Sequence, residues 1–228
     1  MITLKEAVAT LQASGSTHKA SEMASHHKVS RLYLGVQNAA LDAAVKTWRA
    51  DMALDERLTL ASDLWDSNIH EGRMAAAKLL VQARIKPDDA AWALITSWVP
   101  QTDTNAIAEQ VCNAGSRRLL TNPSRIDELE GWTTSDHAWT KRAALMMTLP
   151  WTKLNNPKPA DFALREGVLG WAGDYTADQT WLIQTAVSGW LRELGRHDAP
   201  RVWAFLDAHG DNMKPSQRKD ASRNLPPR

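Results

Sequence analysis

The chain has 228 residues, of which 43% are hydrophobic and 23% are charged, as in globular domains and unlike disordered chains. Its 27 basic and 26 acidic residues give a net charge of +1, so any basic surface has to come from segregation of charge within the fold. The single cysteine, Cys112, excludes an internal disulfide and a paired-cysteine zinc site, which fits a reducing, cytoplasmic location.

Helical spacing of apolar residues runs through nearly the whole chain, and the alternation typical of β-strands is missing. Thr3 followed by Glu6 predicts a capping box at the first helix. Pro87 is expected in the first turn of a helix, where proline is tolerated. In chain order the spacing predicts helices at 3–13, 18–30 (a short polar helix or a loop), 37–49, 55–66, 69–84, 87–98, 103–114, 123–130, 136–149, 160–171, 178–195, 198–208 and 215–223.

Short loops marked by Pro, Gly, Asn and Asp join these segments. About a dozen helices with no strand between them are typical of stacked helical pairs that bury a continuous core and leave one face free. We therefore expect an all-α, HEAT-like α–α superhelical solenoid. No linker long enough to divide the chain is present, so a single domain over residues 1–228 is expected, with its termini apart. No apolar run reaches the length of a membrane span.

The eleven tryptophans stand out against two Phe and two Tyr. We expect most of them to wedge between helices in the core. Glycine-rich phosphate loops and the HExxH, CxxC and GxSxG motifs are missing. The adjacent His26 and His27 point in different directions on a helix, and Cys112 has the surroundings of a small buried thiol. The sequence therefore predicts neither a metal nor another cofactor.

Five segments, in this order and spacing, resemble the bacterial DNA alkylation repair proteins of the AlkD-like, HEAT-repeat type. They are RLYLGVQ (31–37), LWDSNIHEGRMAAAKLL (64–80), SDHAWTKRAALMM (135–147), LIQTAVSGWLREL (182–194) and RVWAFLDAHGDNMKPSQRKDASRNL (201–225). The resemblance implies a C-shaped solenoid that grips duplex DNA in a concave groove, and an activity that excises cationic N3- and N7-alkylpurines. It also implies a monomer that acts on double-stranded, alkylated DNA.

The chemistry that the resemblance implies needs few groups. A cationic base leaves without a general acid, so one carboxylate that stabilises the oxocarbenium-like sugar suffices. The family arginine of a W-x-x-R-A-A helix corresponds to Arg142, with Trp139 and Lys141 beside it. The family's tryptophan followed four residues later by aspartate has no counterpart in any register of residues 95–115. Glu109 or Asp103 is the carboxylate expected to replace it.

A second departure lies in LIQTAVSGWLREL. The family's tryptophan falls on Gly189, and Trp190 follows one position, or about 100°, later on the helix. We expect Gly189 to leave room where the family has a ring, and Trp190 to be a packing wedge, although it stays among the candidate DNA contacts. Those candidates are Arg142, Lys141, Trp139, Arg117, Arg118, Trp190, Lys214, Arg218 and Lys219.

Three functions remain open at this point. The first is an alkylpurine glycosylase with a rearranged site. The second is a DNA-binding solenoid that has lost excision. The third is a helical-repeat scaffold that binds proteins and no nucleic acid, which a net charge near zero also permits.

Overall fold

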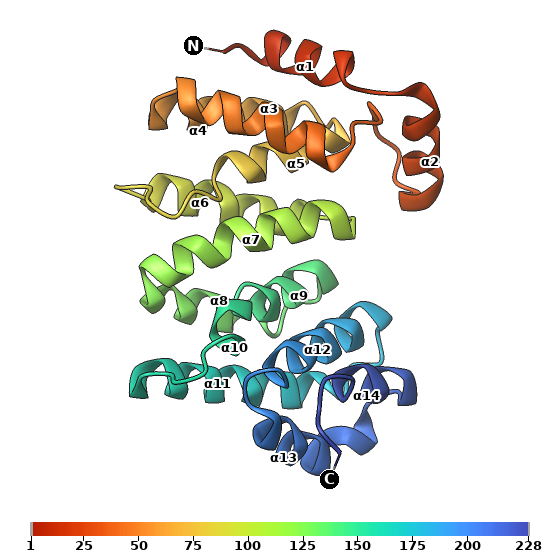
Figure 1. The fold of residues 1–228 in the computed structure, drawn as a ribbon, viewed down its shortest axis with the longest axis vertical. Coiled ribbons are helices and arrows are strands. Elements are labelled where there is room, and N and C mark those ends of the chain that lie inside the picture. The colour runs from red at the N-terminus through yellow and green to blue at the C-terminus, as the bar shows by residue number, and fades with distance from the viewer. Residues whose placement is uncertain (1, 228) are drawn as a thin grey trace. The chain divides into compact units, whose positions relative to one another are not determined.

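The computed structural model describes residues 2–227, which form fourteen α-helices and three short 3₁₀ helices and contain no β-strand (Figure 1). The one β-type contact in this part of the chain is an isolated parallel bridge between Leu32 and Ile69. The prediction of an all-α fold is therefore confirmed. No helix of the described residues has the length and apolarity that a membrane crossing requires.

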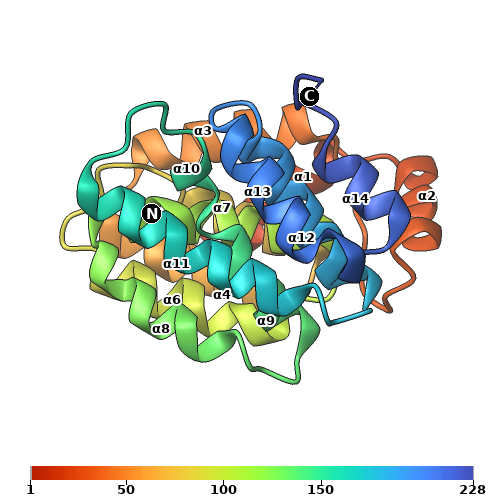
Figure 2. The ribbon, with the colours of Figure 1, turned by 90° about the horizontal axis from the view of Figure 1, so that it is seen from below.

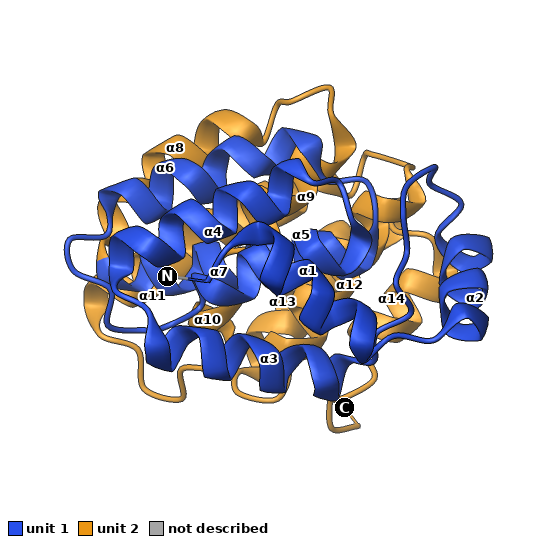
Figure 3. Cartoon of the chain, turned by 90° about the horizontal axis from the view of Figure 1, so that it is seen from above, with its two compact units in different colours: residues 1–121 blue, residues 122–228 orange. Residues whose placement is uncertain are grey.

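The chain divides into two compact units, residues 1–121 and residues 122–228, which are described separately (Figure 3). The predicted single domain is not tested by this division. The α-helices of unit 1 are α1 (Leu4–Ala13), α2 (Thr17–His27), α3 (Asn38–Asp51), α4 (Leu54–Asp66), α5 (His70–Leu79), α6 (Asp89–Trp98) and α7 (Asn105–Thr121). The 3₁₀ helix η1 (Val99–Gln101) precedes α7.

Unit 2 begins with the 3₁₀ helix η2 (Pro123–Arg125), and η3 (Gly210–Asn212) lies near its end. Its α-helices are α8 (Ile126–Trp132), α9 (Ala138–Met146), α10 (Leu149–Thr152), α11 (Pro159–Tyr175), α12 (Trp181–Leu194), α13 (Ala199–His209) and α14 (Pro215–Ala221). Helix α12 packs against α9, α13 and α14, and Figure 2 shows it beside the last two.

The helix boundaries follow the sequence pattern with informative exceptions. The Thr3–Glu6 capping box forms as predicted. The helix expected at 69–84 ends at Leu79, because the buried Arg118 takes up the carbonyl oxygens of Gln82 and Ala83. Pro87 was expected inside a helix but precedes α6, which begins at Asp89, so that prediction was wrong. Helix α7 is longer than predicted and ends at Thr121.

The core of unit 1 depends on a buried carboxylate. Glu71 on α5 is 1% exposed and accepts hydrogen bonds from the backbone N–H groups of Leu34 (2.9 Å), Gly35 (2.7 Å) and Val36 (3.1 Å). Gly35 has φ of +73°, a conformation that glycine adopts without strain. The carboxylate therefore holds the loop that joins α2 to α3.

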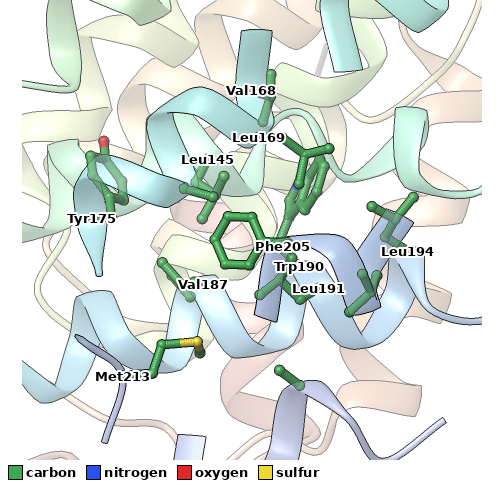
Figure 4. Close-up of a cluster of buried hydrophobic side chains, with 14 of the residues drawn as sticks. Leu145, Val168, Leu169, Tyr175, Val187, Trp190, Leu191, Leu194, Phe205 and Met213 are labelled. Atoms are coloured by element: carbon green, nitrogen blue, oxygen red, sulfur yellow. The ribbon is translucent and has the colours of Figure 1, made fainter. Parts of the chain in front are cut away.

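Tryptophans build much of the remaining core, as expected. In unit 1 the rings of Trp65 and Trp98 stack with their centroids 4.6 Å apart, and both are nearly inaccessible. In unit 2, Trp190 lies in a cluster of buried residues with Leu145 and Phe205 (Figure 4). Its Nε1–H donates to Thr148 Oγ1 at 3.0 Å, so the indole's polar atom is also satisfied.

We predict that Glu71→Gln destabilises the protein by about 3 kcal/mol, because an amide offers one acceptor oxygen where the carboxylate satisfies three backbone donors. The measurement is the free energy of unfolding from urea titration followed by circular dichroism. Glu109→Gln, at an exposed position of α7, is the control and should change stability by less than about 0.5 kcal/mol. Equal effects of the two substitutions would contradict this role of Glu71.

Candidate functional site

Arg142 on α9 is a buried cation that pairs with no acidic side chain of residues 2–227. Its side chain is 7% exposed, and neither a hydrogen bond nor an ion pair holds its guanidinium among residues 2–227. The Nη1 atom is buried without an acceptor. The guanidinium carbon lies 5.8 Å from the ring centroid of Trp139, three residues earlier on the same helix face and half-buried. A buried donor without an acceptor costs free energy in the folded protein.

Lys141, the neighbouring candidate, is neutralised inside unit 2. Its Nζ lies 2.7 Å from Asp178 Oδ2 and 5.1 Å from the ring centroid of Tyr175. Burial acts to raise the pKa of Asp178, but hydrogen bonds from Lys141 and Thr180 outweigh it and lower that pKa to about 2. Asp178 is therefore ionised at neutral pH, and the Lys141 ammonium is engaged by the protein itself.

Gly189 leaves room at the surface of α12 and Trp190 packs into the core, as we expected from their positions on the helix. Trp190 is fully buried, so its place among the candidate DNA contacts is corrected: it is a core residue. Gly189 lies on the partly exposed face, where an added methyl group would meet only Arg192 Nη2, at 3.9 Å. The surface at Gly189 is therefore open.

An aromatic residue that sequence reasoning missed lies on the same face of α12. Trp181 is 59% exposed, and Thr185 and Gly189 follow it at intervals of four residues. The Oγ1 atom of Thr185 is buried and lacks a hydrogen-bond partner. The sequence could have shown this, because residues 181, 185 and 189 lie four apart and so share a helix face that the buried residues of α12 do not occupy.

The two candidate carboxylates have different surroundings, both in unit 1. Asp103 lies between η1 and α7 and forms an ion pair with Arg31, whose side chain is 2% exposed. The second carboxylate oxygen of Asp103, Oδ1, is buried without a partner. Glu109 is exposed on α7, and its carboxylate has no hydrogen-bond or ion-pair partner among residues 2–227. Asp103 therefore has its charge compensated, and Glu109 faces solvent.

Arg117 and Arg118 are neighbours with opposite surroundings. Arg118 is 0% exposed and binds the carbonyl oxygens of Gln82 and Ala83, with Asp88 Oδ2 at 3.5 Å from its Nη1. It cannot contact DNA in this conformation, so its assignment as a DNA contact is corrected to a structural role. Arg117 is exposed, and its side chain has no polar partner in the described part of the chain.

The C-terminal cations are partly engaged. Lys214 Nζ donates to Gln179 O at 2.6 Å, and Arg218 Nη1 lies 2.9 Å from Asp211 Oδ1. Lys219 is exposed, and its ammonium group pairs with no side chain that the structure describes. Four of the nine candidate DNA contacts have side chains with no hydrogen-bond or ion-pair partner among residues 2–227. They are the buried Arg142, the half-buried Trp139, and the exposed Arg117 and Lys219.

Comparison with known proteins identifies relatives of this chain. The profile of a family described as "DNA alkylation repair enzyme" matches residues 7–225. The fold is similar to that of a structure titled "Predicted DNA alkylation repair enzyme from Enterococcus faecalis", with a TM-score of 0.75, 13% identity, and coverage of 92% of this chain and 95% of the other.

Two structures from Streptococcus mutans are also similar. AlkD2 gives a TM-score of 0.67 at 16% identity and covers 99% of this chain and 100% of the other. The protein smu.31 from strain UA159 gives 0.64 at 16% identity, with 98% and 100% covered. None of the curated protein sequences matches this chain. At these identities the structural likeness establishes the fold alone.

We predict that Gly189→Ala stabilises the protein by about 0.5 to 1 kcal/mol, because the methyl group meets open space and alanine is the better helix former. Gly72→Ala is the contrasting variant, because there the methyl group would lie 3.1 Å from Leu64 O, so overpacking outweighs the helix gain and stability falls. Urea midpoints measure both. A destabilised Gly189→Ala variant would show that the surface at Gly189 is not open.

Proposed function

Because the chain belongs to the family of DNA alkylation repair enzymes, we propose that it binds duplex DNA and that Arg142 is a central phosphate contact. The observation that supports this most strongly is the buried Arg142 guanidinium without an acceptor. A phosphodiester offers the two oxygens that a guanidinium binds side by side. The guanidinium carbon also lies 5.8 Å from the ring centroid of Trp139, within reach of a cation–π interaction.

The contact we propose carries no sequence information, because phosphate contacts fix the position of a protein on DNA while base contacts specify sequence. Trp181 supplies a different kind of contact. Its exposed ring and the open surface at Gly189 share one face of α12, and an exposed ring of this size suits a sugar or base. We therefore assign phosphate binding to Arg142 and aromatic contact to Trp181.

We further propose that excision of alkylpurines is weak or lost. Stabilisation of an oxocarbenium-like sugar needs a carboxylate whose charge is free to act on the sugar. The charge of Asp103 is compensated by Arg31, and Ile107, at the family's aspartate position when counting back from Gly115, is a fully buried apolar residue. Glu109 has no contact that would orient it.

We predict that duplex DNA binding falls steeply with salt and that Arg142→Met weakens it by about 10- to 100-fold, through loss of a charge-assisted hydrogen bond. Since the guanidinium has no acceptor within the described chain, Arg142→Met should leave the urea midpoint unchanged or raise it. Fluorescence anisotropy with a labelled duplex measures the affinity.

The control is Arg84→Ala, which removes one arginine from an exposed position where its side chain has no polar partner among the described residues, and it should have little effect on affinity. Arg142→Lys should recover only part of the binding, because an ammonium group lacks the planar fork. Undetectable binding at low salt, or equal losses for Arg142→Met and Arg84→Ala, would refute the proposed role of Arg142.

For excision, we predict that this protein releases 7-methylguanine from a defined duplex at least about 100-fold more slowly than an enzyme that retains the carboxylate. Losing one charge-stabilising group costs roughly 2.7 to 4 kcal/mol of transition-state stabilisation. Single-turnover release is measured for the wild type, Asp103→Asn and Glu109→Gln. Release equal to that of the protein-free duplex in all three supports a binding protein. Robust release that one substitution abolishes would overturn this proposal and identify the carboxylate.

A further inference from the structure

Unit 1 contains a polar hollow that neither the sequence analysis nor the family match identified. Helices α3, α5 and α7 pack in this order, α5 against both neighbours (Figure 1). Between them lies a hollow of about 300 Å³. The polar side chains that line it are Asp42, Lys46 and Arg49 of α3, Lys78 of α5, and Gln110 and Asn113 of α7.

The charges in this hollow do not cancel. Lys78 Nζ lies 2.7 Å from Asp42 Oδ1, so these two residues neutralise each other. Lys46 and Arg49, three residues apart on α3, have no hydrogen-bond or ion-pair partner among residues 2–227. The hollow therefore carries two uncompensated positive charges.

A third cation lies close to Arg49. Burial, and after it the charge of Arg49, lower the pKa of Arg57, whose side chain is 9% exposed and whose Nε is buried without a partner. Arg57 does not line the hollow and donates from Nη1 to Gln82 Oε1, so the positive charge inside the hollow comes from Lys46 and Arg49.

Neutral donors face the cations across the hollow. Gln110 and Asn113 are three residues apart on α7, and their side-chain amides have no hydrogen bonds within the described part of the chain. Arg117 follows Asn113 by one helical turn and is exposed. Amide N–H groups and guanidinium groups together suit the several oxygens of a phosphate.

We propose that this hollow binds a backbone phosphate of the bound DNA, with Lys46 and Arg49 supplying charge and Gln110 and Asn113 supplying neutral hydrogen bonds. The inference rests on the proposed function and adds to it a contact in unit 1. Asp42 acts by holding Lys78, and the Lys46–Arg49 pair is left for the ligand.

Duplex affinity, measured by anisotropy from about 50 to about 200 mM salt, tests the proposal. The double variant Lys46→Ala/Arg49→Ala should bind more weakly and lower the slope of log affinity against log salt by about one, the value for one lost phosphate contact. The control Lys5→Ala/Lys158→Ala removes the same charge at exposed positions outside the hollow and should keep the slope.

A second variant separates a built site from diffuse charge. Gln110→Ala/Asn113→Ala should weaken duplex binding by about tenfold at fixed salt and leave the salt slope unchanged, because two neutral hydrogen bonds are lost and no charge is removed. An unchanged affinity of this variant overturns the proposal, as does a control that behaves like Lys46→Ala/Arg49→Ala.

Calorimetry with inorganic phosphate identifies the source of the anion. Tight binding of free phosphate, with the hollow variants keeping full duplex affinity, would make the hollow a small-anion site and overturn the assignment to DNA. If Arg142→Met weakens duplex binding and the hollow variants match the control, only this inference fails. If the wild type binds no duplex, the proposed function fails as well.

Discussion

The constraint on which this structure depends is that buried polar groups need partners when water is excluded. Glu71 satisfies three backbone donors of one loop, and Arg118 satisfies two carbonyl groups of another. Gln184 bridges Thr176 O and Asp178 O at the start of α12. These side chains act where helices end, so they fix the joints of an all-helical chain that has no disulfide. Five arginines of the described residues have buried nitrogens without a partner, and Arg142 differs from the other four because neither a hydrogen bond nor an ion pair holds its guanidinium.

The same constraint sorts the basic residues into two classes, and sequence alone does not separate them reliably. Lys141, Arg118 and Arg218 satisfy acceptors within their own unit. Arg142, Arg49 and Lys46 do not. The net charge of +1 does not reveal this division, because acidic residues neutralise cations of the first class and leave those of the second class without an ionic partner among the described residues. What matters for binding is therefore which cations remain uncompensated after folding.

The fold class and most helices could be predicted from the sequence because apolar periodicity is a local signal. The capping box of Thr3 and Glu6 could be predicted for the same reason. The end of α5 could not, because Arg118, which holds the chain there, lies 36 residues beyond Gln82. The burial of Arg118 itself had a local signal, since Val111, Ala114 and Gly115 lie on its face of α7 and are buried too. The hollow of α3, α5 and α7 had none, because it joins three segments distant in sequence.

The pair Gly189–Trp190 has a consequence for substitution in α12. An indole at the second position is buried in the core, which contributes roughly 5 kcal/mol of apolar burial. The first position faces outward, where the resemblance places the family's ring. Two neighbouring positions of α12 thus decide whether an aromatic ring lies at the surface or in the core, so substitutions at these two positions alone would exchange one for the other, with no insertion or deletion.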